Sequence, residues 1–140
     1  MRIAIGADAG HPLVDAVRDW CLAAGHHVDV VADGAPWPEA GRRVGQAVAT
    51  GNDDRGVVLC WTGTGVSIAA NKVAGVRAAL CADAETARGA RRWNDANVVA
   101  LSMRTTTPTV AAEILTAFLG DEEADPAEAG NIAQLDGPMR

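Results

Sequence analysis

Residues 57–72 read Val-Val-Leu-Cys-Trp-Thr-Gly-Thr-Gly-Val-Ser-Ile-Ala-Ala-Asn-Lys, and the rest of the chain can be understood from them. An apolar run ends at Cys60, a glycine-rich turn follows, and small and apolar residues then recur at helical spacing. This order predicts a strand, a loop and a helix. In such a unit the N–H groups of the loop and of the first helical turn converge on one place. They can bind negative charge there without a basic side chain.

Cys60 stands at the edge of this predicted anion site. Positive potential from a helix N-terminus favours the thiolate, so a thiol there can act as a base or a nucleophile. Cysteine is also among the most buried residue types, and a structural role is the alternative for Cys60. The stretch lacks the Gly-Lys-Ser/Thr end of a Walker loop and the G-x-G-x-x-G spacing of a dinucleotide site. A nucleotide site is therefore not expected, and no cofactor is predicted.

The composition indicates one acidic domain. The chain has 140 residues, of which 49% are hydrophobic, and this is enough for a single buried core. The net charge of −6 and the pI near 4.9 argue against nucleic acid and anionic membranes as partners. No apolar run approaches the roughly 18 to 20 residues of a membrane span. The N-terminus leads directly into a predicted strand rather than a signal peptide, so we expect a cytoplasmic protein.

The cysteines and histidines form no metal-binding pattern. Cys21, Cys60 and Cys81 are odd in number and widely spaced, which is typical of reduced thiols rather than of a disulfide framework. There is no Cys-x-x-Cys pair and no histidine pair at helical spacing, so no metal site is predicted. We expect Cys60 to be the accessible, reactive thiol, because Cys21 and Cys81 fall at apolar positions of a predicted helix and a predicted strand.

Strand-like and helix-like segments alternate along the chain and are joined by short links. This alternation predicts a doubly wound α/β domain, in which five parallel strands lie between two layers of helices and are connected by right-handed crossovers. Ligands bind such sheets at the carboxyl ends of the strands, where Asp8 and Cys60 are expected. The predicted strands are residues 2–6, 28–31, 57–60, 77–81 and 97–101, and the predicted helices are residues 12–24, 40–49, 66–72, 84–93 and a segment that starts at Thr107-Pro108.

The spacing Cys-x-Thr-Gly-x-Gly-x-Ser-Ile-x-Ala-Asn-Lys, from Cys60 to Lys72, resembles the signature of the RpiB/LacA/LacB sugar-phosphate isomerase family, typified by type B ribose-5-phosphate isomerase. Three more segments resemble that family in the same order along the chain. They are Ile3-Ala-Ile-Gly-Ala-Asp8, Gly75-Val-Arg-Ala-Ala-Leu-Cys81 and Asn94-Asp-Ala-Asn-Val98.

The resemblance implies an organisation as well as a chemistry. It implies a Rossmann-like, three-layer α/β/α sheet with the strand order 2-1-3-4-5, in a homodimer whose subunits share an active site. We expect residues 1–120 to form the isomerase-like domain. Residues 121–140 form an acidic C-terminal tail, and in the family this tail packs on the partner subunit and helps to form its active site.

An aldose–ketose isomerase moves a proton between C1 and C2, so it needs a base near these carbons and stabilisation of the enediolate oxygen. The resemblance implies that Cys60 is the base, that Thr62 adds its hydroxyl and that Asp8 holds substrate hydroxyls. Hydrogen bonding within the turn is the alternative role for Thr62 and Asp8. Backbone donors to the enediolate are expected from the turn that contains Gly63, Thr64, Gly65 and Val66.

Several residues depart from the family pattern. The histidine that follows the family's first aspartate is missing, and the ring-opening histidine is replaced by Trp93, which precedes the retained Asn94. The stretch that matches the phosphate-binding arginines of the family's tail is Gly130-Asn-Ile-Ala-Gln134. Only Arg104, after the fifth predicted strand, resembles an anion contact that is kept.

Tryptophans occupy three motif positions. Trp37 stands where the family commonly has tyrosine, Trp61 where it commonly has glycine, and Trp93 where it has histidine. Indole faces pack well against the C–H faces of sugars, so all three are candidate substrate-binding residues. The alternative is that Trp61 and Trp93 fill a disused pocket.

The charge of the tail bears on the substrate. Acidic residues in place of the arginines would repel a phosphate group. We therefore predict an aldose–ketose isomerase or epimerase that acts through Cys60 on a non-phosphorylated sugar or polyol-like substrate. A non-catalytic binding or structural descendant of the family and an ordinary ribose-5-phosphate isomerase are the alternatives. An open pocket beside Cys60 would favour the first hypothesis, a filled pocket the second, and an anion near Arg104 the third.

Overall fold

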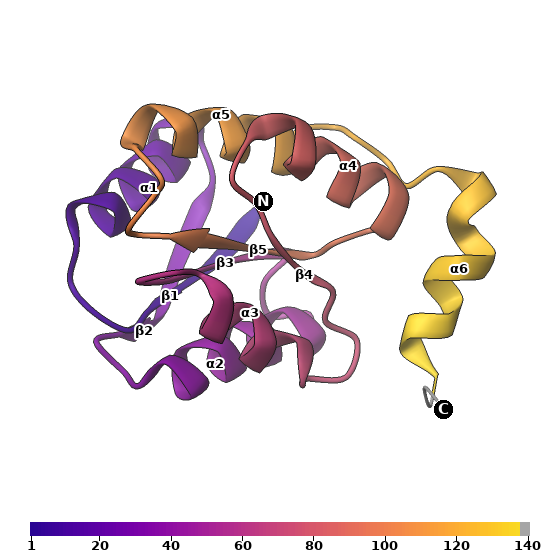
Figure 1. Ribbon diagram of the computed structural model, residues 1–140, viewed down its shortest axis with the longest axis horizontal. Helices are drawn as coiled ribbons and strands as arrows, with labels where there is room; N and C mark the ends of the chain where they lie inside the picture. Colours follow the sequence, from indigo (N-terminus) through magenta and orange to yellow (C-terminus); the bar gives the residue numbers. More distant parts are fainter. Residues whose placement is uncertain (138–140) are drawn as a thin grey trace.

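The computed structural model describes residues 1–137 and shows a five-stranded parallel sheet between two layers of helices (Figure 1). The predicted doubly wound α/β/α architecture is confirmed. The strands are β1 (Arg2–Ala7), β2 (His27–Asp33), β3 (Arg55–Cys60), β4 (Ala78–Leu80) and β5 (Val98–Ser102). The helices are α1 (Pro12–Ala23), α2 (Trp37–Ala49), α3 (Thr64–Asn71), α4 (Ala84–Asn94), α5 (Pro108–Phe118) and α6 (Ala129–Ala133), with the short 3-10 helices η1 (Pro126–Glu128) and η2 (Gln134–Asp136).

The two faces of the sheet are covered by hydrophobic cores whose side chains differ in size. Helices α1, α4 and α5 cover one face, where large side chains such as Leu13, Ile114 and Phe118 are fully buried (Figure 1). Helices α2 and α3 cover the other face, where the core consists of alanines and valines together with Cys60. Because alternate residues of a strand point to opposite faces, Val57 and Leu59 belong to the first core, whereas Val58 and Cys60 belong to the second.

The strand order is β2-β1-β3-β5-β4, so the expected order 2-1-3-4-5 is wrong in its last two strands. All five residues of β5 are buried, and this strand pairs with β3 on one side and with β4 on the other. Strand β4 has only three residues, none of them fully buried. A short, half-exposed strand suits the edge of a sheet, whereas a fully buried apolar strand suits an interior position.

Local sequence signals set the helix starts. His11 precedes α1 and its Nδ1 accepts a hydrogen bond from the Leu13 N–H at 3.0 Å. Thr107 caps α5 in the predicted way, since its Oγ1 accepts from the Val110 N–H at 3.2 Å and Pro108 follows it. Helix α2 starts at Trp37, three residues before the predicted start, because Pro38 fits the first turn, where no N–H donor is needed.

The C-terminal arm, which we define as residues 121–137, extends beside the α/β body rather than covering it (Figure 1). None of its residues is buried. It is held to the body by polar contacts: Asp125 donates its N–H to the Arg92 carbonyl at 2.7 Å, and Asp136 pairs with Arg77 at 3.2 Å. The last three residues of the predicted tail, 138–140, lie outside the described residues. Within residues 1–137 no helix combines the length and the apolar character that a membrane crossing needs.

Candidate active site

The carboxyl ends of β1, β3 and β5 lie side by side and bring most of the predicted site residues together. The Asp8 N–H donates to the Leu59 carbonyl at 3.3 Å, which places Asp8 next to the end of β3. The Met103 N–H donates to the Cys60 carbonyl at 3.0 Å, and the Arg104 N–H donates to the Trp61 carbonyl at 2.9 Å. The segment after β5 therefore runs directly beside the loop that follows Cys60.

Gly63 shapes that loop. Its φ of 75° is left-handed, and it forms the N-cap of α3. A Cβ atom at this position would lie 2.6 Å from Leu80 Cδ1 and 3.0 Å from the Leu101 carbonyl carbon. Both the backbone conformation and the lack of space require glycine here. Strands β4 and β5 thus press against the loop and fix the direction in which α3 starts.

The first turn of α3 presents three backbone donors. The first intrahelical bond runs from the Ser67 N–H to the Gly63 carbonyl at 3.2 Å, so the N–H groups of residues 64–66 have no intrahelical acceptor. Thr62 Oγ1 accepts from the Thr64 N–H at a long 3.4 Å, which is the turn bond that had been the alternative role for Thr62. Gly65 is half-buried, Thr64 is exposed but its N–H shares this long bond with Thr62, and Val66 is fully buried. The role of these N–H groups as donors to an oxyanion stays a prediction.

Cys60 ends β3 with its side chain on the α2 and α3 side of the sheet. Cys60 is 5% exposed, compared with 0% for Cys21 and 1% for Cys81. It is the most exposed of the three thiols, but it is buried, whereas the sequence predicted an accessible thiol. Val66 of α3 lies in the same buried cluster. Burial raises the pKa of the Cys21 thiol to about 11, and burial together with Asp83 raises the pKa of Cys81 to about 11. These two thiols are therefore held protonated at neutral pH.

Trp37 and Trp61 lie at the outside of the loop after Cys60 and do not fill a pocket there. The Trp37 ring packs over Gly65, where an added Cβ would lie 2.9 Å from the ring atom Cε3. Trp61 is 59% exposed, and its carbonyl accepts from Ser102 Oγ at 2.9 Å. The alternative in which Trp61 plugs a disused pocket is therefore wrong for the chain by itself.

Charged side chains at this end of the sheet are left without partners. Asp8 is half-buried and Arg104 is exposed. Among residues 1–137 neither of them forms an ion pair or a side-chain hydrogen bond. One carboxylate and one guanidinium therefore stand at the site with their hydrogen-bonding capacity unused. No three His, Cys, Asp or Glu side chains within this part of the chain gather as a metal site would require.

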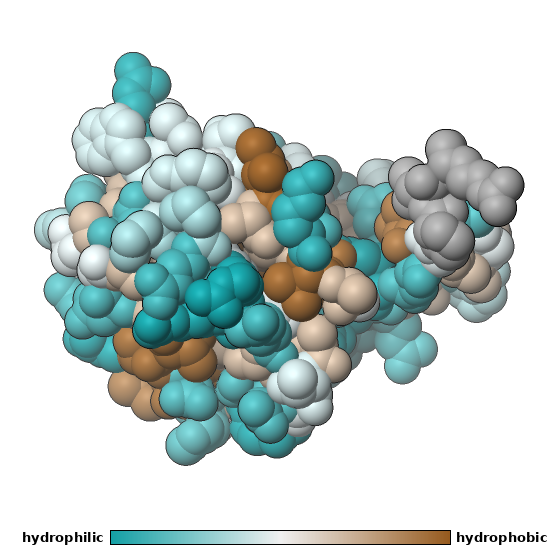
Figure 2. Space-filling view, turned by 90° about the horizontal axis from the view of Figure 1, so that it is seen from below, coloured by the Kyte–Doolittle hydropathy of each residue, from teal (hydrophilic) through white to brown (hydrophobic). Residues whose placement is uncertain are grey.

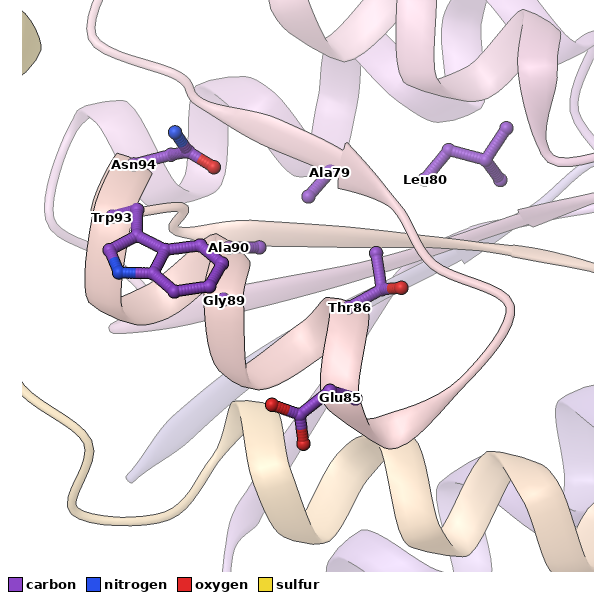
Figure 3. A pocket seen from close by; sticks show the side chains of 8 residues that line it. All are labelled: Ala79, Leu80, Glu85, Thr86, Gly89, Ala90, Trp93 and Asn94. Carbon is purple, nitrogen blue, oxygen red and sulfur yellow. The ribbon is translucent and has the colours of Figure 1, made fainter.

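Trp93 and Asn94 lie elsewhere. Helix α4 starts after the carboxyl end of β4 and runs back, so its last residues are near the amino ends of the strands, where the Asn97 N–H donates to the Arg77 carbonyl at 3.0 Å. Figure 3 shows Trp93 and Asn94 at the opposite end of α4 from Thr86, with the indole lying along the helix. Trp93 is 53% exposed. The chain does not bring these two residues to its own Cys60.

These residues instead line a cavity of about 410 Å³ along the outer edge of β4 (Figure 3). Leu80 lines the other end of this cavity and also touches the position where a Gly63 Cβ would be. The cavity therefore extends along β4, from Leu80 beside the loop after Cys60 to Trp93. Trp93 borders an open space and does not fill a pocket beside Cys60.

Two supporting residues were not predicted. Ser102 is a buried hydroxyl whose Oγ donates to the Trp61 carbonyl and accepts from the Thr105 N–H at 3.2 Å, which ties the loop to the end of β5. Asn71 exchanges two hydrogen bonds with Ala78, at 2.8 and 2.9 Å, and so pairs with the outer edge of β4. A lone serine at the end of the apolar run Val98–Leu101 was a signal for Ser102, whereas the partner of Asn71 had no local signal.

Comparisons with known proteins agree with this geometry. A family model described as Ribose/Galactose Isomerase matches residues 3–135. The D-erythrulose-4-phosphate isomerase of Pectobacterium atrosepticum is 38% identical to this chain, over 96% of the chain and 93% of that protein.

Two solved structures are similar over nearly the whole chain. Ribose-5-phosphate isomerase B of Clostridium thermocellum has a TM-score of 0.89 at 35% identity, and the match covers 97% of this chain and 95% of that one. The ribose 5-phosphate isomerase of Thermotoga maritima has a TM-score of 0.88 at 33% identity, with 96% and 97% covered.

Proposed function

This chain belongs to the RpiB/LacA/LacB family and is a sugar isomerase of that type, and we propose that it uses the Cys60 thiolate as its proton-transferring base. The observation that supports this proposal is the position of Cys60. It ends β3 immediately before a loop and helix whose first three N–H groups have no intrahelical acceptor. A base and an oxyanion site thus lie next to each other at the carboxyl end of the sheet.

The reaction then follows from ordinary carbonyl chemistry. The thiolate removes a proton from the carbon beside the carbonyl, and the electron pair moves onto the carbonyl oxygen to give an enediolate. The N–H groups of residues 64–66 and the Thr62 hydroxyl stabilise the negative oxygen. The thiol returns the proton to the former carbonyl carbon. The neighbouring hydroxyl loses its proton as it becomes the new carbonyl, and the enediolate oxygen gains one as it becomes a hydroxyl, so ketose becomes aldose with no net change in protons and no cofactor. Asp8 and the faces of Trp37 and Trp61 hold the rest of the sugar.

The far end of the substrate is proposed to be uncharged. The arm carries acidic residues at 121–123, 125, 128 and 136 and has no basic residue within 121–137. Each charge-assisted arginine–phosphate bond is worth roughly 1.5–3 kcal/mol, so a site without two such arginines binds phosphate about two to four orders of magnitude more weakly. Arg104 is the one arginine whose backbone lies beside the loop within the described residues.

A four-carbon sugar phosphate is the second candidate. It is favoured by the unpartnered Arg104 and by the similarity to the protein named D-erythrulose-4-phosphate isomerase. An aldotetrose closes its ring through the C4 hydroxyl, and a phosphate on C4 prevents this closure. Such a substrate is always open-chain, so an enzyme that acts on it has no need of the ring-opening histidine that Trp93 replaces.

The active site is proposed to be completed by a second copy of the chain. Trp93 and Asn94 are separated from their own Cys60, and they border an open cavity beside β4, the edge strand of the sheet. The arm stands beside the body with no buried residue. In a homodimer the partner subunit would supply these elements to each Cys60.

Deuterium exchange from heavy water tests the chemistry and the substrate together. Erythrulose, ribulose, erythrulose 4-phosphate and ribulose 5-phosphate are each incubated with the wild-type enzyme and with Cys60→Ala, and label at the carbons next to the carbonyl is measured by NMR. We expect exchange that is lost in Cys60→Ala and that favours a neutral sugar. Exchange confined to the four-carbon phosphate supports the second candidate. Exchange that persists in Cys60→Ala would contradict the proposed mechanism.

A further inference from the structure

A groove runs between α2 and α3 on the outer face of the molecule, which Figure 2 views from below. The two helices touch closely, because an added Cβ at Gly41 would lie 2.6 Å from Ala69 Cβ and 2.7 Å from the Val66 carbonyl oxygen. The groove has a volume of about 520 Å³, which is within the range of small-molecule sites. Its apolar lining comes from Trp37, Ile68 and Val73.

The charge of this groove is opposite to that of the whole protein. Arg42 and Lys72 line it, and within residues 1–137 neither forms an ion pair. Among residues 1–137 the Arg42 side chain donates one hydrogen bond, from Nη1 to Gln46 Oε1 at 3.2 Å. Glu39 is the single acidic residue of α2, and it is already bonded to Arg43, while α3 has no acidic residue. Two uncompensated cations therefore flank an apolar groove on a chain of net charge −6.

Trp37 connects this groove to the candidate active site without merging the two. Its side chain lines the groove, while its ring also packs over Gly65 at the start of α3. Gly65 and Trp37 lie at the N-terminal ends of their helices, and Gly45 and Val73 are in contact at the other ends. The two helices are therefore parallel, and the groove extends from Trp37 away from Cys60.

We propose that this groove is a second small-molecule site, which binds an anion with a flat apolar body such as an aromatic sulfonate or carboxylate. The apolar body lies against Trp37, Ile68 and Val73, and the anionic group lies between Arg42 and Lys72. An aromatic face offers a large contact area at little entropic loss, and a partly desolvated charge gains more from each cation than a fully hydrated one. This inference is independent of the reaction at Cys60.

Fluorescence titration with 8-anilinonaphthalene-1-sulfonate tests the proposal. The probe is expected to bind the wild-type protein saturably, with one strong site per chain. Arg42→Glu/Lys72→Glu should weaken the binding of this probe at least tenfold. The affinity for the uncharged probe N-phenyl-1-naphthylamine should differ less than twofold between this variant and the wild type. The matched control is Arg18→Glu/Arg88→Glu, which changes the net charge equally at two exposed arginines away from the groove and should leave sulfonate binding within twofold of wild type.

Three outcomes overturn the proposal. The first is sulfonate binding that is unchanged in Arg42→Glu/Lys72→Glu while thermal melts show both double variants folded. The second is an equal loss in the Arg18→Glu/Arg88→Glu control, since that would reflect net charge alone. The third is a wild-type protein that does not bind the probe and in which Ile68→Asp changes the sedimentation coefficient, because the groove is then an interface between copies of the chain.

Discussion

The amino and carboxyl ends of the sheet differ in how far their charged groups are paired within the chain. At the amino end several charged groups are paired within the chain: Arg2 bonds to Asp54 at 3.0 Å, and Arg77 and Arg91 each bond to Asp95 at 3.0 Å. The Arg2 hydrogen bond lowers the pKa of Asp54. These groups satisfy one another, so this end of the molecule is built for stability.

At the carboxyl end the polar groups are left open. Asp8 and Arg104 form no ion pair within residues 1–137, and the N–H groups of residues 64–66 have no intrahelical acceptor. Groups that remain unsatisfied by the chain itself are available to a ligand. The difference indicates that the carboxyl end is the site of the chemistry and that the charges of the amino end are structural.

Trp93 and Asn94 are the exception, since they are candidate site residues at the amino end. If a partner subunit brings them to Cys60, then Cys60→Ala and Trp93→Ala/Asn94→Ala each lose activity by about 10²-fold or more. Mixing the two variants and allowing subunits to exchange should restore about a quarter of wild-type activity, because half of the dimers are mixed and each has one intact site. Activity that stays at the level of the separate variants would contradict a shared site.

Asp95 tests whether the amino end is structural. Its carboxylate bonds to Arg77 and to the buried Arg91, and its φ of 46° is one that asparagine tolerates. Asp95→Asn leaves Arg91 buried without its counter-charge, and it should lower the free energy of unfolding by somewhat less than the roughly 3–5 kcal/mol of a fully buried pair. Urea unfolding measures this loss. The control Asp19→Asn, in an exposed pair with Arg18, should change it by less than about 1 kcal/mol.

Substitution of Gly63 tests whether the carboxyl end is needed for activity as well as for stability. Gly63→Ala combines a left-handed φ with a Cβ placed 2.6 Å from Leu80, and should cost about 1–3 kcal/mol of stability. Isomerase activity should fall further than stability alone explains, because the donors of residues 64–66 are displaced. The matched control is Gly51→Ala at the amino end, which has the same left-handed φ, 77°, but open space around the added Cβ, and which should cost stability without a further loss of activity. Full activity in Gly63→Ala would show that the loop geometry is not required.

Asp53 is a carboxylate at the amino end that lacks full hydrogen bonding within residues 1–137. It is buried, its Oδ2 has no partner, and burial together with Asp29 raises its pKa. A raised folded-state pKa means that the protonated form is favoured by folding, so stability is lost as the pH rises through that pKa. Asp53→Asn should therefore stabilise the protein at pH 7 by up to about 1 kcal/mol, and the gain should shrink toward pH 4. Thermal melts across this range measure it, and a gain that grows on acidification would contradict the assignment.

The sequence predicted the features that depend on local signals. The strand, loop and helix around Cys60, the cap at Thr107 and the parallel α/β class all follow from residues close in the chain, whereas the cap at His11 was not predicted. The positions of β4 and β5 were wrong because strand order depends on which strand is buried on both faces, and that is decided by packing between distant segments. The Arg77 and Asp95 pair spans 18 residues and had no local signal.

The sequence predicted the location of some candidate site residues better than that of others. Asp8 and Arg104 lie at the carboxyl end as expected, because each follows a predicted strand. Trp37 was a candidate only by its motif position, and no strand end indicated that its ring would pack on Gly65. The separation of Trp93 from Cys60 was not foreseen, since a motif match does not say which end of the sheet a helix terminus reaches. The cover over Cys60 was also missed, because the depth of a side chain depends on how closely α3 packs.

Alkylation distinguishes a catalytic Cys60 from a purely structural one. The protein is treated with iodoacetamide near neutral pH, modified cysteines are mapped by mass spectrometry, and isomerase activity is followed in parallel. We predict that Cys60 is modified first and that activity falls in step with its modification. Cys21 and Cys81 should stay unmodified, because burial holds their pKa at about 11. Full modification of Cys60 with activity retained, or loss of activity before Cys60 is labelled, would contradict the account.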